Sequence, residues 1–220
     1  MKKFLIVFCC FFLLVGCGKV EEKKVEEEKK EEPFVLEKVD EKKDYVYLTD
    51  YKTVKLGTDD YKLKNLIVNI KGSAADNVNL ELKSFVIKSY DEYQIYEGLL
   101  VQGKVIDYDY YVTDKYISIV QSYYMTVDTM RGDEDYHSYV ISLTSGKTLD
   151  NNALLSEYNH TEQEIYDRLE KEIKDEDADY IIARIKKDGF NLIVNDKNQL
   201  VVLYRVINDD ESIIKKLVLN

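Results

Sequence analysis

The first seventeen residues, MKKFLIVFCCFFLLVGC, constrain the rest of this chain more than any other segment. Lys2 and Lys3 form a basic start, an apolar run extends from Phe4 to Val15, and a small-residue cleavage site ends at Cys17. This order is typical of an export signal that ends in a lipid-attachment cysteine. We therefore expect residues 1–16 to be a lipoprotein signal peptide, and the thiol of Cys17 to carry the lipid.

An uncleaved membrane-spanning helix is the alternative for this segment. Such a helix needs about 20 apolar residues, whereas this apolar run is shorter and a charged tract follows it at once. Two acyl chains on Cys17 would hold a protein stably at a bilayer. We therefore expect a lipid-anchored protein on the extracytoplasmic face of a bacterial membrane, with either one or two membranes in the envelope.

The same segment determines how the chain can use its cysteines. Cys9 and Cys10 would leave with the signal peptide and Cys17 would carry the lipid, so no disulfide and no thiolate metal ligand would remain. About 200 residues would be left, enough for one domain whose core needs no disulfide. We expect one folded domain over residues 45–220.

We expect residues 17–44 to be a lipidated cysteine followed by a tether rich in lysine and glutamate. The tract KVEEKKVEEEKKEE has almost no apolar residue to bury, and Pro33 would end any helix that it forms. The formal net charge of the whole chain is −11. Phosphate-rich partners would be repelled, so we expect no nucleic acid, while a cationic partner would be attracted.

The hydrophobic pattern of the remaining chain alternates between periods of two and 3.6, which indicates strands mixed with helices. We expect a single α+β domain with one largely antiparallel sheet and two to four helices. Capping patterns start two of them, at Ser73 and at Thr161 with Glu164. The expected strands cover 45–56, 61–70, 98–127 with a turn at 113–115, 136–143, 190–194, 200–207 and 213–219, and the expected helices follow residues 73, 149, 161 and 178.

Four segments give the chain a resemblance to a known family. They are LIVNIKGSAADNVNLEL from Leu66, YISIVQSYY from Tyr116, ISLTSGKTLDNNALL from Ile141 and NQLVVLY from Asn198. Together they resemble the extracytoplasmic domain of RsiV-type anti-sigma factors and PdaC-type deacetylases, with Ser145 in place of the usual threonine of a turn. The resemblance implies a non-catalytic sensor or wall-associated module, because the deacetylase chemistry of that family lies in a separate domain that we do not expect here.

The residues themselves predict no catalytic motif and no cofactor. His137 and His160 are the only histidines, too few for a multi-histidine zinc site. His137 beside a charged loop is a weak candidate for an acid/base or metal site. A carboxylate-only calcium site stays open at Asp107–Asp114 or Asp133–Asp135, although neither segment has the spacing of a calcium loop. The tripeptide Arg131-Gly132-Asp133 is too short to indicate adhesion.

Tyrosine is the unusual residue of this chain, with 19 tyrosines and no tryptophan. Tyrosine rings stack on sugars and anchor interfaces, but they are also ordinary strand residues. We select Tyr108, Tyr110, Tyr123 and Tyr124 as the candidate ligand face. Strand alternation would place Tyr108 and Tyr110 on one face and Tyr111 on the other.

These patterns favour a membrane-tethered, non-catalytic binding or sensing module whose ligand is a cell-wall component or a cationic wall-active protein. Two alternatives stay open. A small wall hydrolase would need two carboxylates in a cleft, one with a raised pKa. A structural component of an envelope assembly would expose a sizeable apolar patch.

Overall fold

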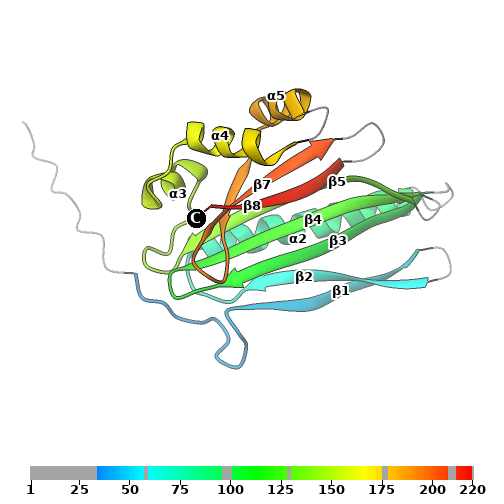
Figure 1. Ribbon diagram of the computed structural model, residues 1–220. Helices are drawn as coiled ribbons and strands as arrows, with labels where there is room; N and C mark the ends of the chain where they lie inside the picture. Colours follow the sequence, from blue (N-terminus) through cyan, green and yellow to red (C-terminus); the bar gives the residue numbers. More distant parts are fainter. Residues whose placement is uncertain are drawn as a thin grey trace, which may run out of the picture. The chain divides into compact units, whose positions relative to one another are not determined.

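The computed structural model describes residues 34–56, 59–95, 101–127, 130–174, 178–207 and 212–219. Within these ranges, side chains are described except at 54–56, 59, 92–95, 101–104, 125–127, 130–133 and 207. One compact unit starts at Phe34 and extends to the end of the chain. Within it, the described residues form four helices and three antiparallel sheets (Figure 1).

The first sheet is a hairpin of β1 (Val46–Leu56) and β2 (Asp59–Val68). Helix α2 (Ser73–Ile95) follows and packs against β2. The side chain of Asn79 on α2 pairs with the backbone of Val68, accepting from its N–H at 2.7 Å and donating to its carbonyl at 2.9 Å. A side chain of the helix therefore satisfies backbone groups at the end of β2.

The central sheet has the order β3–β4–β5. Its strands are β3 (Val101–Val112), β4 (Tyr116–Val127) and β5 (Met130–Ser142). Figure 1 shows α2 running behind β3 and β4. The hydroxyl of Tyr61 on β2 donates to the carbonyl of Ile106 at 3.0 Å and accepts from its N–H at 3.1 Å, which closes part of the outer edge of β3.

The third sheet has the order β6–β7–β8, made of β6 (Asn191–Val194), β7 (Leu200–Ile207) and β8 (Ser212–Val218). It is preceded by the helices α3 (Asn151–Glu157), α4 (Glu162–Glu172) and α5 (Ala178–Asp188). These helices lie beside β6–β8, and α5 contacts β7 (Figure 1). The helical layer therefore covers the third sheet and leaves the end of α4 close to β7 and β8.

The hydrophobic core lies on both faces of β4. Ile117 and Ile119 belong to a cluster with residues of β2 and α2, whereas Tyr116 and Val120 belong to a larger cluster with β6–β8 and the helices α3–α5. Because neighbouring residues of a strand point to opposite faces, one strand contributes to both clusters. The central sheet is thus an internal layer.

The segment before β1 is packed against the domain. The buried side chain of Asn69 donates to the carbonyls of Asp40, Lys43 and Asp44 and accepts from the N–H of Asp40. Further along, the ring of Phe34 lies against Gly146 and fills the space that a Cβ there would need. The compact unit thus begins at Phe34, eleven residues before the start that we predict at residue 45.

The α+β prediction is confirmed, and the order of helices and strands follows the hydrophobic pattern. The capping box predicted for Thr161 and Glu164 is present in both directions. Two details differ from the prediction. Strand β5 begins at Met130 rather than near residue 136, because polar residues continue the pairing with β4. The antiparallel strands also form three separate sheets rather than one.

Asn69 acts as a clamp, because its side chain binds the backbone of Asp40, Lys43 and Asp44. Replacing it should destabilise the domain. The substitution Asn69→Ala removes four hydrogen bonds and leaves part-buried backbone groups without partners. We expect the free energy of unfolding to fall by about 1–3 kcal/mol in urea denaturation. Asn77→Ala, on the exposed side of α2, is the matched control and should stay within about 0.5 kcal/mol. Equal stability of the two variants would contradict a clamp role.

Candidate functional site

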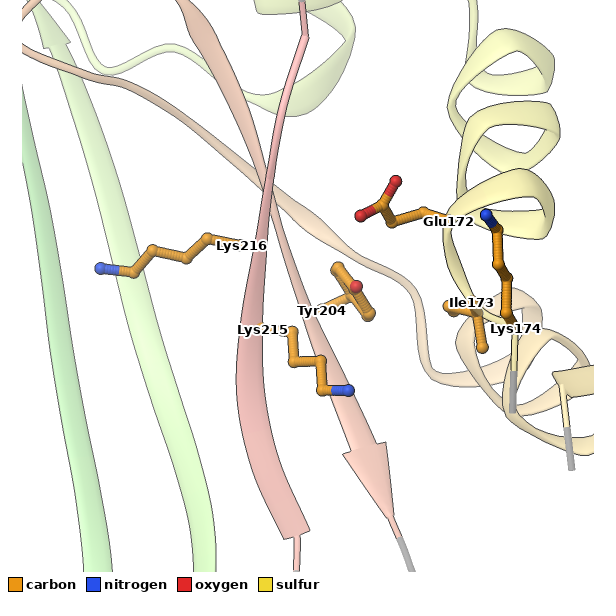
Figure 2. Close-up of a pocket in the computed structure, with 6 residues that line it drawn as sticks. All are labelled: Glu172, Ile173, Lys174, Tyr204, Lys215 and Lys216. Carbon is orange, nitrogen blue, oxygen red and sulfur yellow. The ribbon is translucent and has the colours of Figure 1, made fainter. Parts of the chain in front are cut away.

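A hollow of about 470 Å³ opens between the end of α4 and the strands β7 and β8 (Figure 2). This volume lies within the range of about 300–1,000 Å³ that small-molecule sites occupy. We call it the Tyr204 hollow, and it is lined by Glu172, Ile173, Lys174, Tyr204, Lys215 and Lys216. Its walls combine a phenol, a carboxylate and ammonium groups, so they suit a ligand with polar or charged groups.

The floor of the hollow is Tyr204. It lies on β7, the middle strand of the third sheet, and is 3% exposed. Burial raises the pKa of the Tyr204 phenol, and the charge of Glu172 raises it further. The phenol is therefore neutral at physiological pH and can both donate and accept a hydrogen bond.

The two walls of the hollow follow from local structure. On the helix side, Ile173 ends α4 and is buried in the core, while the adjacent Glu172 and Lys174 are exposed. On the strand side, Lys215 of β8 is the direct antiparallel partner of Tyr204, so the two side chains lie on the same face. Figure 2 shows Tyr204 between Glu172 and Lys215.

Lys216 lies on the opposite face of β8. It points away from Tyr204 toward the central sheet, where its Nζ atom lies 2.5 Å from a carboxylate oxygen of Asp109 on β3 (Figure 2). Partial burial lowers the pKa of Lys216, but the hydrogen bond to Asp109, the charge of Asp109 and the contributions of Tyr111 together raise the pKa overall. Lys216 is thus an ion-pair partner of Asp109 rather than a free cation of the hollow.

Among the residues that the structure describes, three carboxylates have a clearly shifted pKa, and in each the pKa is lowered. Lys71 lowers the pKa of Glu37 through a hydrogen bond, the backbone of Thr161 lowers that of Glu164, and Arg184 lowers that of Asp188. A general acid that donates a proton near neutral pH needs a raised pKa. These three groups therefore offer no general acid.

The four tyrosines of the predicted ligand face do not form one surface. Tyr108, Tyr110 and Tyr123 share the face of the central sheet that α2 covers, as the strand register requires. Tyr124 follows Tyr123 on β4 and so points to the opposite face. The division of Tyr108 and Tyr110 from Tyr111 is as predicted, because Tyr111 packs against the core cluster on the other side.

Two of these four rings, Tyr108 and Tyr123, are part of the packing. The hydroxyl of Tyr108 donates to the carbonyl of Lys64 at 3.1 Å and accepts from Gln121 at 3.0 Å. The ring of Tyr123 lies 4.6 Å from that of Phe85, and its hydroxyl donates to Asp135 at 3.1 Å. Of the four side chains, only that of Tyr110 is exposed, with 42% of its surface accessible. The tyrosine face is therefore a weaker candidate than the Tyr204 hollow.

His137 lies among aromatic rings on β5. Its ring meets the ring of Phe85 edge-on, with the centroids 5.0 Å apart, and stacks on the ring of Tyr123, with the centroids 6.0 Å apart. The other histidine is His160, whose Nδ1 atom lies 3.4 Å from a carboxylate oxygen of Glu164 at the start of α4. The two histidines are thus on different elements with different partners.

The acidic calcium candidates also do not converge. Asp109 is paired with Lys216, and Asp114 accepts a hydrogen bond from Asn198. Among the residues described, no group of three or more His, Cys, Asp or Glu side chains could hold a metal ion. The side chains of 131–133, with the Arg131-Gly132-Asp133 tripeptide and the Asp133 carboxylate, lie outside the described set.

The predicted signal peptide, Cys17 and most of the predicted tether also lie outside the described residues. Within the part of the chain that the structure covers, no helix is long and apolar enough to cross a membrane.

Comparisons with known proteins assign the chain to no family. No protein-family model matches the chain, and no curated protein matches it either.

Sequence reasoning did not find the residues of the Tyr204 hollow. Glu172, Lys174 and Lys215 are ordinary charged residues in a chain that is rich in them, and no spacing connects them with Tyr204. The only sequence signal is alternation in the last two strands, which places Tyr204 and Lys215 on one face once their register is known.

Alkaline pH should destabilise the domain through its buried tyrosines. Burial raises the pKa of Tyr108 and of Tyr136 to about 12, whereas an unfolded tyrosine titrates near about 10. Their contribution to stability is complete below about pH 10 and is lost as the pH rises toward 12, because only the unfolded state ionises in that window. Urea denaturation between pH 8 and 12 measures this loss, and Tyr108→Phe should make it less steep. A flat profile from pH 10 to 12 would contradict the prediction.

Proposed function

We propose that this chain is a bacterial lipoprotein whose α+β domain is a non-catalytic binding or sensing module at the cell envelope, with a cell-wall component as its ligand. The observation that carries the proposal is the Tyr204 hollow, whose lining includes a buried phenol and two exposed lysines, Lys174 and Lys215. Ammonium groups bind carboxylates and phosphates, and bacterial wall polymers carry both. The resemblance to the RsiV-type and PdaC-type extracytoplasmic domain implies the same class of module.

A cationic wall-active protein is the second candidate ligand. The observation that favours it is the exposed face of α4, which carries carboxylates along its length. These are Glu162, Glu164, Asp167, Glu170 and Glu172. Such a surface would speed association with a cationic protein, and salt would weaken the effect.

The lipid anchor can be tested directly on the full chain. We expect Cys17→Ser to abolish incorporation of a labelled fatty acid and to move the protein out of the membrane fraction, because the thiol is the proposed attachment atom. Fractionation and acyl labelling of cells that express either form provide the measurement. Unchanged membrane association with Cys17→Ser would contradict lipid anchoring at this residue.

The binding surface can be tested with purified wall sacculi and a soluble chain of residues 18–220. We expect the wild-type chain to be retained and Lys215→Glu to lose at least tenfold in retention, since the change reverses one of the charges that face Tyr204. Lys197→Glu is the matched control, because Lys197 is exposed in the turn between β6 and β7.

Three outcomes separate the candidates. Loss with Lys215→Glu alone supports the hollow as the wall-binding site. Equal retention of both variants contradicts it. Retention on a cationic muramidase but not on sacculi, weakened by salt, would transfer the assignment to the acidic face of α4.

A further inference from the structure

We propose that the Tyr204 hollow recognises a short peptide that carries a free carboxylate together with a free amino group. The inference rests on the proposed function, because it names the ligand class of the same hollow. It follows from which of the lining groups face Tyr204 and from the signs of their charges.

The groups that face Tyr204 have mixed charge. Lys216 also lines the hollow, but it points away and its charge is balanced by Asp109 (Figure 2). The Lys174 side chain runs along α4 and also points away from Tyr204, so Lys215 and Glu172 are the charged groups on either side of the phenol (Figure 2). One cation and one anion on either side of a phenol are complementary to a ligand with one ammonium group and one carboxylate.

The positions of these groups divide the hollow into two sides. Lys215 is fixed beside Tyr204 by the strand register, so a ligand carboxylate bound there would also reach the phenol, which can donate to it. Glu172 lies on the helix side, close enough to Tyr204 for its charge to raise the pKa of the phenol. A ligand amino group would bind on that side.

Glu172 makes the hollow unsuited to a phosphate. A phosphate would be attracted by Lys215 but repelled by the Glu172 carboxylate on the opposite wall, and it has no ammonium group to compensate. A peptide with both ends free satisfies both walls at once. This difference separates peptide ends from the phosphates of anionic wall polymers.

The test uses the soluble chain of residues 18–220 and four probes. These are alanyl-alanine, its N-acetylated form, its C-terminal amide and inorganic phosphate. We expect alanyl-alanine to shift the backbone amide signals of Lys174, Tyr204 and Lys215 in heteronuclear NMR, with each blocked peptide and phosphate at least fivefold weaker. Equal binding of the blocked peptides, or tighter binding of phosphate, would overturn the inference.

Two pairs of variants assign the two ends of the peptide. Glu172→Gln should remove the preference for a free amino group and leave the preference for a free carboxylate. Asp167→Asn, on the exposed side of the same helix, is its control. Lys215→Gln should remove the preference for a free carboxylate, with Lys197→Gln as control. Preferences that survive both site variants would also overturn the inference.

The two proposals can fail separately. Sacculus binding that depends on Lys215, without any response to the dipeptide, would keep the proposed function and reject the peptide ligand. Dipeptide binding at the hollow without sacculus retention would keep the ligand class and reject the wall as its source.

Discussion

The structure depends on the burial of β4 on both faces. Six consecutive residues, 116–121, are buried, and successive side chains enter different core clusters. Ile117 and Ile119 pack toward α2 and β2, whereas Tyr116 and Val120 pack toward the third sheet. Burying apolar surface on both sides of a single strand makes the folding of the two clusters interdependent. The hairpin and α2 on one side, and α3–β8 on the other, therefore form one unit.

An internal sheet requires its polar groups to find partners, and side chains provide many of them. Ser118 on β4 accepts a hydrogen bond from the N–H of Val194 on β6. Ser212 of β8 bonds to the N–H and carbonyl of Glu134 on β5, and the Glu134 carboxylate accepts from the N–H of Ile214. These bonds connect the sheets and satisfy strand edges that three small sheets would otherwise leave open.

The sequence predicted the helices and strands well because each has a local cause. Alternation marks the strands, and the Thr161 and Glu164 pair marks the start of α4. The prediction was less accurate where distant residues decide the structure. The order of segment 34–44 depends on Asn69 and Gly146, which lie far along the chain. Whether Tyr108 and Tyr123 are exposed depends on α2, whose position over the sheet no local pattern specifies.

The Tyr204 hollow is also formed by contacts between residues that are distant in the sequence, so no local pattern predicts it. The burial of Ile173 directs α4 against the third sheet, and this contact places Glu172 beside Tyr204 (Figure 2). The floor is a core residue on a central strand, so its position is rigid, whereas the rim consists of exposed side chains. Substitutions at the rim can therefore change the charge around the hollow without disturbing the fold. A binding module with this division can keep one scaffold and vary its ligand.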